Sequence, residues 1–198
     1  MAKSKIYEIY SELKGSEPLI HRTFLISETA TMTKLAYTMM IAFKMQASHL
    51  FCFEIPVKKK LENNDEFLRV EIINEFTEKY DDIEIIDAVE NRVKDIFSEV
   101  GETGTLNYDF GDDWNVQFTV TKIYKDENQD ARELPKVTNG TGYGILEDIG
   151  GVYMLNEITE TYKTKTGETY EEYSEYLGKR FNFTKFDKSK LNSRLKNL

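Results

Sequence analysis

The chain has 198 residues, of which 40% are hydrophobic, 13% aromatic and 31% charged, and its 35 acidic against 26 basic residues give a formal net charge of −9. This composition is typical of a folded globular protein rather than a disordered chain, and the length fits one domain, 1–198. With Cys52 as its single cysteine, the chain cannot form an intramolecular disulfide. Neither a CxxC motif nor a pair of histidines at the spacing of a metal site is present. We therefore expect neither a metal nor any other cofactor.

The longest apolar run, 35–43, is much shorter than the roughly 20 residues that a membrane-spanning helix needs, and a lysine flanks it on each side. The N-terminus passes directly into strand-like sequence, without the apolar segment of a signal peptide. We expect a cytoplasmic protein with no membrane partner.

The first part of the chain predicts the order strand, strand, helix, strand. Residues 6–13 alternate apolar and polar side chains, as a half-buried strand does, and a polar turn leads into a second strand over 19–26. Apolar residues at helical spacing predict a helix over 32–43, and a third strand follows over 49–57. This order predicts a β-grasp-like opening, in which the helix packs on one face of a mixed sheet.

The rest of the chain adds further strands and a helical C-terminus. A solvated loop is expected over 58–66, and a long polar loop over 125–143. The other predicted elements are a strand over 67–76, a short helix over 91–100, two strands over 105–110 and 114–124, and helices over 152–161, 170–177 and 187–195. The predicted fold class is therefore α+β, with a mixed, mostly antiparallel sheet and helices packed on it.

One segment, Tyr108-Asp109-Phe110-Gly111-Asp112-Asp113-Trp114, resembles the signature hairpin of the pRiA-plasmid Orf-three-like domain family. Four further segments agree with that family in order and approximate spacing, namely 13–22, 48–53, 147–153 and 186–195. The resemblance implies an α+β domain over nearly the whole chain. It implies no established molecular activity, although some members carry resolvase-like or repressor-like descriptions.

The chain departs from this family at positions where relatives often have histidine or cysteine. Phe51 and Val116 stand where relatives often have His, and Val137 and Ile149 stand where many have Cys. His21 stands where relatives often have Trp. If those residues bind a metal in relatives, this chain lacks most of the ligands, and the resemblance carries no metal site over to it.

Acidic residues gather around the hairpin. Asp109, Asp112 and Asp113 could meet within a few ångströms and bind a hard cation, but Asp is also common in turns because its carboxylate accepts backbone N–H bonds. Glu147 and Asp148 precede two glycines and indicate a helix start, with Asp148 near the positive end of the helix dipole. If the long loop folds back on the hairpin, both acids could instead join the same cluster.

Other chemically interesting residues allow a structural interpretation as well. Trp114, the only tryptophan, is either a core residue or a ring on which a ligand stacks. His21 and His49 are the two histidines, and strand parity places Cys52 on the opposite face from His49, so Ser–His–Asp or Cys–His catalysis is not expected. The glycines of 139–144 match neither nucleotide-binding fingerprint and indicate a flexible loop.

Charge is distributed unevenly along the chain. Residues 179–198 contain seven basic residues and one acidic residue, a charge of +6, which leaves 19 basic against 34 acidic residues elsewhere. A basic terminal helix could contact phosphates, but the net negative charge repels nucleic acid, and the helix can dock on the protein's own acidic surface. We expect self-docking and no nucleic-acid partner.

The leading functional hypothesis is a binding or interaction domain for a small ligand or a protein. Its recognition surface would combine the hairpin 108–114 with the loop 135–151, and the candidate ligand-binding residues are Asp109, Asp112, Asp113, Trp114, Asp148 and His49. The alternatives are a divalent-metal-assisted hydrolase that uses the hairpin carboxylates and a nucleic-acid-associated protein of mobile elements. The absence of a complete catalytic set favours binding, and no catalytic residue is assigned.

Overall fold

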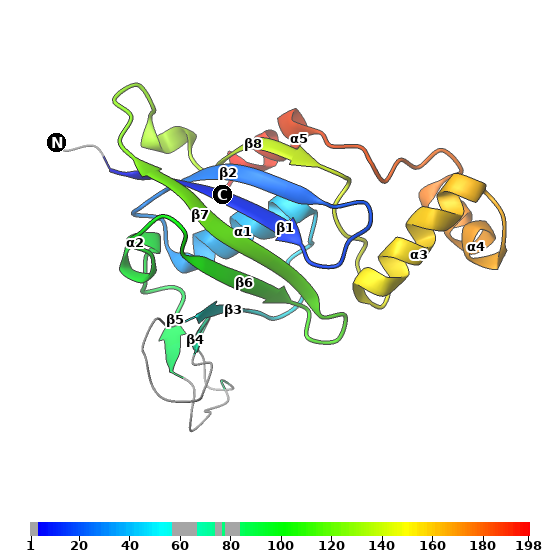
Figure 1. The fold of residues 1–198 in the computed structure, drawn as a ribbon, viewed down its shortest axis with the longest axis horizontal. Coiled ribbons are helices and arrows are strands. Elements are labelled where there is room, and N and C mark those ends of the chain that lie inside the picture. The colour runs from blue at the N-terminus through cyan, green and yellow to red at the C-terminus, as the bar shows by residue number, and fades with distance from the viewer. Residues whose placement is uncertain (1–3, 57–66, 74–76, 78–83) are drawn as a thin grey trace.

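A computed structural model of the protein describes residues 4–56, 67–73, 77 and 84–198. These residues form one mixed sheet in the order β5-β4-β3-β6-β7-β1-β2-β8 (Figure 1). The strands are β1 (Ile6–Leu13), β2 (His21–Ser27), β3 (Phe51–Pro56), β4 (Phe67–Glu71), β5 (Ile85–Asp87), β6 (Thr103–Tyr108), β7 (Trp114–Tyr124) and β8 (Lys136–Thr141). The helices are α1 (Met32–Phe43), α2 (Val93–Ile96), the 3₁₀ helix η1 (Ala131–Glu133), α3 (Gly151–Thr164), α4 (Glu168–Leu177) and α5 (Lys188–Leu195).

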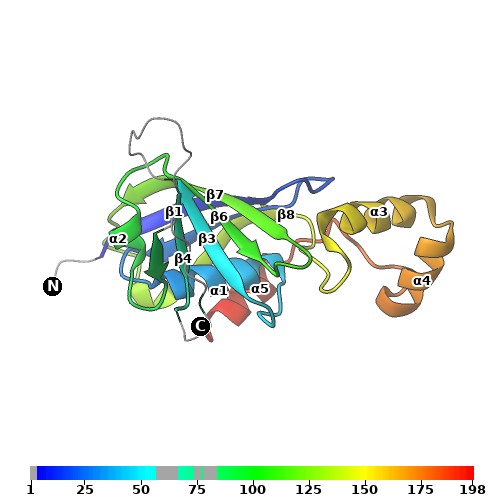
Figure 2. The same ribbon diagram turned by 90° about the horizontal axis from the view of Figure 1, so that it is seen from below.

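Neighbouring strands are antiparallel except β4 and β5, which run parallel. Helix α1 follows the β1–β2 hairpin and covers one face of the sheet, with α5 beside it (Figure 2). The Thr31 side chain begins α1 by accepting the N–H of Lys34 at 3.1 Å. The predicted α+β class and its β-grasp-like opening are confirmed.

Strand β1 shows why the alternating pattern was informative. Tyr7, Ile9 and Leu13 are buried, whereas Glu8 and Glu12 on the other face are partly exposed. Because successive side chains of a strand point to opposite faces, this alternation packs one face against α1 and leaves the other towards water.

The segment 125–143 is not the long polar loop that the sequence predicts, because it contains η1 and the edge strand β8. Strand β8 pairs only with β2, so most of its side chains stay partly or fully exposed and Val137 is the buried apolar residue. An edge strand of this kind lacks the apolar alternation by which strands are recognised. Gly140 lies within it because a Cβ there would come 2.8 Å from the carbonyl oxygen of His21.

Other differences concern short elements. The helix predicted over 91–100 is the single turn of α2, and the short strand β5 was not predicted. The predicted loop 58–66 and most of the region 74–83 lie outside the described residues.

Helices α3 and α4 form a pair that extends away from the sheet (Figures 1 and 2). A cluster of aromatic rings joins this pair to the rest of the domain. The ring centroids of Tyr162 and Phe183 are 5.2 Å apart, and Phe181 lies 4.7 Å from both Phe183 and Tyr143. These edge-on contacts fix the base of the helical pair.

The basic C-terminal helix docks on its own domain. In α5, Leu191 and Leu195 are buried, and the Asn192 side chain both accepts the N–H of Val137 and donates to its carbonyl oxygen, at 2.8 and 2.9 Å. Within the described part of the chain, no ion pair involves a residue of 179–198. The docking therefore depends on apolar burial and amide hydrogen bonds.

Arg22 is fully buried and forms no ion pair with a described carboxylate. Its guanidinium donates to five backbone carbonyls, those of Ala42, Tyr143, Gly142, His21 and Thr141. The rings of Phe43 and Phe186 flank the guanidinium at 5.2 and 5.0 Å. Burial lowers the pKa of Arg22 to about 10, so the side chain stays charged at neutral pH while it joins β2, the end of α1 and the residues after β8.

We expect Arg22→Met to lower the free energy of unfolding by at least about 3 kcal/mol, because five carbonyls lose a donor and each unsatisfied buried acceptor costs roughly 1–3 kcal/mol. The measurement is urea denaturation followed by circular dichroism. As a control, Lys122→Met removes an exposed ion pair with Glu8 and should change stability by less than about 1 kcal/mol. Equal effects of the two substitutions would contradict this role for Arg22.

His21 makes stability depend on pH. Its ring stacks on Tyr10 with centroids 5.5 Å apart, and burial, followed by the charge of Arg22, lowers the pKa of His21 below its ordinary 6.5. The unfolded chain then binds a proton at His21 more readily than the folded protein does. The contribution of His21 to stability is therefore complete above about pH 6.5 and is lost as the pH drops towards the folded pKa. Thermal melts between pH 8 and 5 should show a smaller loss for His21→Gln than for the wild type, and parallel profiles would refute the assignment.

Candidate functional site

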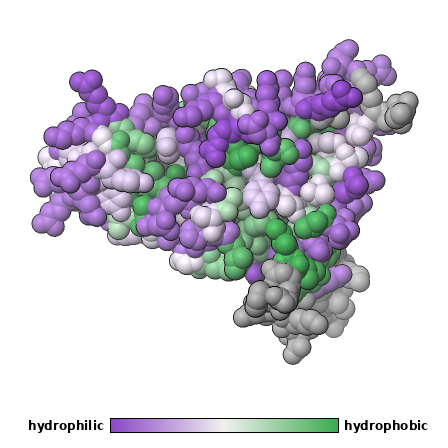
Figure 3. Space-filling model, turned by 180° about the vertical axis from the view of Figure 1, so that it is seen from behind, coloured by the Kyte–Doolittle hydropathy of each residue, from purple (hydrophilic) through white to green (hydrophobic). Residues whose placement is uncertain are grey.

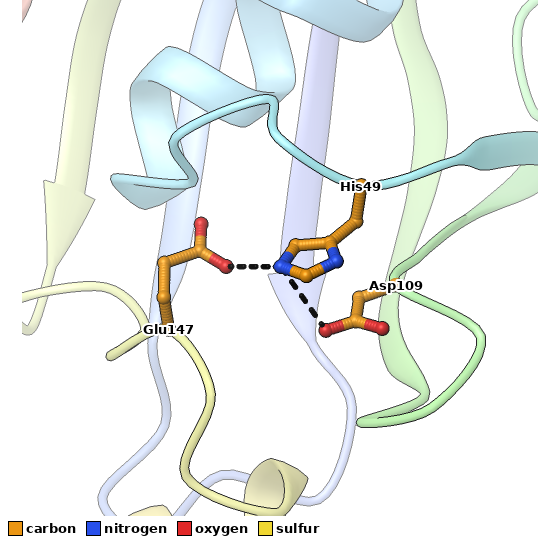
Figure 4. Close-up of side chains that lie close together, drawn as sticks. All are labelled: His49, Asp109 and Glu147. Carbon is orange, nitrogen blue, oxygen red and sulfur yellow. Dashed lines mark ion pairs between the residues drawn. The ribbon is translucent and has the colours of Figure 1, made fainter.

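A histidine and three carboxylates come together beside the β6–β7 turn. Figure 4 shows the histidine with two of these carboxylates, those of Asp109 and Glu147. His49 Nε2 lies 3.7 Å from Asp109 Oδ2, 3.8 Å from Glu147 Oε2 and 3.3 Å from Asp148 Oδ1. The three segments that supply them are the residues before β3, the β6–β7 turn and the residues before α3. One ligand atom from each of His49, Asp109 and Glu147 lies within 4.8 Å of the other two. We call His49, Asp109, Glu147 and Asp148 the histidine–acid cluster.

The β6–β7 turn fixes the position of Asp109. Its backbone has a φ of 56°, a left-handed conformation that Asp tolerates better than most residues, and its N–H donates to the carbonyl of Leu50 at 3.0 Å. Asp109 Oδ1 accepts the N–H of Gly111 at 3.1 Å. A hydrogen bond within the turn therefore holds Asp109 Oδ1, while Oδ2 faces His49.

Glu147 is held by two donors from distant parts of the chain. Its Oε1 accepts the N–H of Gln46 at 2.5 Å and the hydroxyl of Tyr108 at 3.1 Å. Burial raises the pKa of Tyr108, which keeps the phenol protonated and able to donate. The ring of Tyr108 also packs edge-on against His49, with centroids 5.8 Å apart. Tyr108 thus orients two members of the cluster.

Asp112 joins the turn to the segment before α3. Its two carboxylate oxygens accept the N–H groups of Ile149 and Gly150 at 3.2 and 3.1 Å. Gly151 has a φ of +79°, and a Cβ on it would come 2.3 Å from the Asp112 carbonyl oxygen. The close approach of two backbones thus explains Gly151, whereas Gly150 has open space around it and a φ of +88° that favours glycine. The Asp112 carboxylate places negative charge at the N-terminus of α3.

The other two hairpin candidates lie away from His49. Asp113 accepts a hydrogen bond of 2.6 Å from the Asn107 side chain. Trp114 is 0% exposed, and its buried indole Nε1 has no hydrogen-bond partner among the residues that the structure describes. It presents no ring face on which a ligand could stack. Of the three hairpin aspartates, only Asp109 therefore joins His49, together with the predicted Asp148.

Glu147 is not among the candidate ligand-binding residues predicted from the sequence, although the sequence allows it to join the cluster together with Asp148. No local sequence pattern distinguishes Glu147 from the other acids of the chain, although its side chain is buried in the structure. Its role depends on contacts with Gln46 and Tyr108, which are far away in the sequence. The sequence signal for Glu147 is its position with Asp148 next to two glycines, which brings both acids to the cluster only if the loop folds back onto the hairpin.

A cavity of about 840 Å³ lies beside the cluster, and His49 forms part of its wall. Its other walls come from α1, β3, β4 and the β6–β7 turn, and include Cys52 and the half-exposed Phe110. Hydrophobic side chains gather on this side of the molecule among polar ones (Figure 3). Burial raises the pKa of Cys52 to about 11, so the thiol is protonated at neutral pH and is not a nucleophile.

With this geometry established, comparison with known proteins assigns the chain to a family. It belongs to the family described as plasmid pRiA4b ORF-3-like protein, which it matches over residues 5–190. The resemblance seen in the hairpin is thereby confirmed. No function is established for this family.

Among solved structures, the chain is similar to the crystal structure of a protein of unknown function from Methanosarcina mazei Go1. The TM-score is 0.76 and the sequence identity 25%, and the match covers 94% of this chain and 96% of the other. A search of curated proteins found no match. Among the described residues, no helix is long and apolar enough to cross a membrane.

We expect Asp112→Asn to lower the free energy of unfolding by about 1–2 kcal/mol, the typical effect of losing a helix cap, because an amide replaces one of the two oxygens that hold the start of α3. The matched substitution Asp113→Asn in the same turn should change stability by less than about 0.5 kcal/mol. Chemical denaturation of both variants measures the difference. A smaller effect at position 112 than at position 113 would contradict the role of Asp112.

Proposed function

We propose that the protein is a binding domain that captures a positively charged ligand at the histidine–acid cluster. The observation that carries this proposal is that three carboxylates lie within 3.8 Å of one imidazole nitrogen. No lysine or arginine in the described ranges forms an ion pair with Asp109, Glu147 or Asp148. A single imidazole cannot balance three negative charges, so a cation would complete the site.

The charge of the whole protein supports the same kind of ligand. A net charge of −9 attracts cations to the surface and repels nucleic acid. The cluster takes Asp109 from the β6–β7 turn and Glu147 and Asp148 from the residues before α3, the two segments of the recognition surface predicted from the sequence. The proposed ligand-binding residues are therefore His49, Asp109 and Asp148 from the sequence prediction, with Glu147 added from the geometry.

The chemistry of the cluster favours binding over nucleophilic catalysis. It contains one imidazole and carboxylates, and the neighbouring Cys52 is protonated at neutral pH. A metal-assisted hydrolase stays a prediction from the sequence, with the cavity beside His49 as the place where its substrate would lie.

The proposal is tested by thermal melts of the full chain with MgCl₂, CaCl₂, MnCl₂, ZnCl₂ and spermidine, each compared with NaCl of equal ionic strength. We expect at least one of these cations to raise the melting temperature, since a ligand at about 100 times its Kd adds roughly 2.7 kcal/mol to stability. The shift should vanish in the Asp109→Asn/Glu147→Gln double variant and persist in Asp113→Asn. If every cation shifts the double variant as much as the wild type, the proposal is wrong.

A further inference from the structure

The buried carboxylate of Glu147 has an oxygen without a hydrogen-bond partner. The side chain is 6% exposed, and while Oε1 accepts two hydrogen bonds, Oε2 accepts none from any described residue. Leaving such an oxygen unsatisfied is costly, and an ion or water at the site is one common explanation. Oε2 lies on the side of His49 Nε2, at 3.8 Å, which is too long for a hydrogen bond.

The two carboxylate oxygens of Asp109 also have different surroundings. Oδ1 accepts the N–H of Gly111, and Oδ2 lies 3.7 Å from His49 Nε2. Each carboxylate is thus anchored by one oxygen and presents the other to a common point. In metal sites, outer hydrogen bonds of this kind orient the side chains that bind the metal.

The spacing of His49 Nε2, Asp109 Oδ2 and Glu147 Oε2 fits a single small ion. Ligand atoms about 2.0–2.2 Å from a zinc-like ion at tetrahedral angles lie roughly 3.4 Å from one another. The distances from His49 Nε2 to Asp109 Oδ2 and Glu147 Oε2 are 3.7 and 3.8 Å, and the ligand atoms of the three residues all lie within 4.8 Å of one another. Side-chain rotations would therefore bring all three atoms into coordination range. Figure 4 shows the three side chains directed towards one another from three separate segments.

From this geometry we propose that the cationic ligand is a divalent transition-metal ion bound by His49 Nε2, Asp109 Oδ2 and Glu147 Oε2. The inference deepens the proposed function and rests on it. One imidazole and two carboxylates suit ions such as Mn²⁺, Fe²⁺, Co²⁺ and Zn²⁺, whereas Ca²⁺ and Mg²⁺ prefer oxygen ligands alone. Asp148, which is 76% exposed and 3.3 Å from His49 Nε2, marks the solvent side, where a coordination position stays open to water or an external ligand.

Tyr108 acts as a positioning residue in this site. Its hydroxyl holds Glu147 Oε1, and its ring supports the imidazole of His49. Outer partners of this kind commonly change metal affinity by about 10–100-fold when they are removed. Tyr108→Phe keeps the ring and removes the hydroxyl, which donates to Glu147 Oε1 and accepts the N–H of Ser48, next to His49. The substitution therefore tests the orientation of the ligands apart from core packing.

The test uses the full chain after chelator treatment and dialysis, titrated with MnCl₂, ZnCl₂ and CoCl₂ by calorimetry. We expect one equivalent to bind the wild type and Asp113→Asn with equal affinity. Because Glu147→Gln and Asp109→Asn each remove a direct ligand, they should weaken binding by at least about 100-fold, and Tyr108→Phe by at least about tenfold. Visible d–d bands of bound Co²⁺ should change in His49→Gln, since they report the loss of the imidazole ligand.

The outcomes separate the metal inference from the broader proposal. Absence of transition-metal binding, or equal affinity of the wild type and the Glu147→Gln and Asp109→Asn variants, would overturn the metal inference. If spermidine or Ca²⁺ still stabilises the wild type but not the double variant, cation capture survives without a transition metal. If no cation acts on the wild type, both ideas fail. Circular dichroism of each variant ensures that a loss of binding is not a loss of fold, and Asp109→Asn provides the result should Glu147→Gln fail to fold.

Discussion

The domain depends on a buried cation that is neutralised by dipoles rather than by an opposite charge. Arg22 meets five carbonyl groups and two aromatic rings, and these belong to β2, to the end of α1, to the residues after β8 and to the segment before α5. Carbonyl oxygens that would otherwise be left over at a helix end and a strand end thus receive a donor. The guanidinium suits this task because its planar fork carries five N–H donors, which the ammonium group of a lysine cannot imitate.

The same region sets the position of the candidate site. The carbonyl of Phe43, at the end of α1, accepts the N–H of Ile145, so the chain that leaves the Arg22 carbonyls runs directly into the loop that carries Glu147. Gln46, just beyond α1, donates to Glu147, and Asp112 then closes the loop onto the β6–β7 turn. The histidine–acid cluster is consequently held from three sides by backbone contacts, although each member sits outside regular structure.

Much of the fold could be predicted from the sequence because its central elements have strong periodic patterns. The limits of β1 and β7 were predicted as observed, since both strands have one buried face. Strand β8 was missed because an edge strand shows no clear alternation. For the site, local sequence features suggested His49, Asp109 and Asp148 as separate candidates. Glu147 could not be selected, because its importance comes from its hydrogen bond with Gln46, which is 101 residues away in the sequence.

The docking of α5 has a consequence for how molecules of this protein meet. The exposed edge of a sheet offers unpaired N–H and C=O groups that can recruit a strand from another molecule. At Val137 the Asn192 amide occupies both of these groups, so it imitates the peptide unit of a neighbouring strand. At this point of the β8 edge, a side chain of the protein itself therefore stands in for a neighbouring strand and opposes strand addition by another molecule.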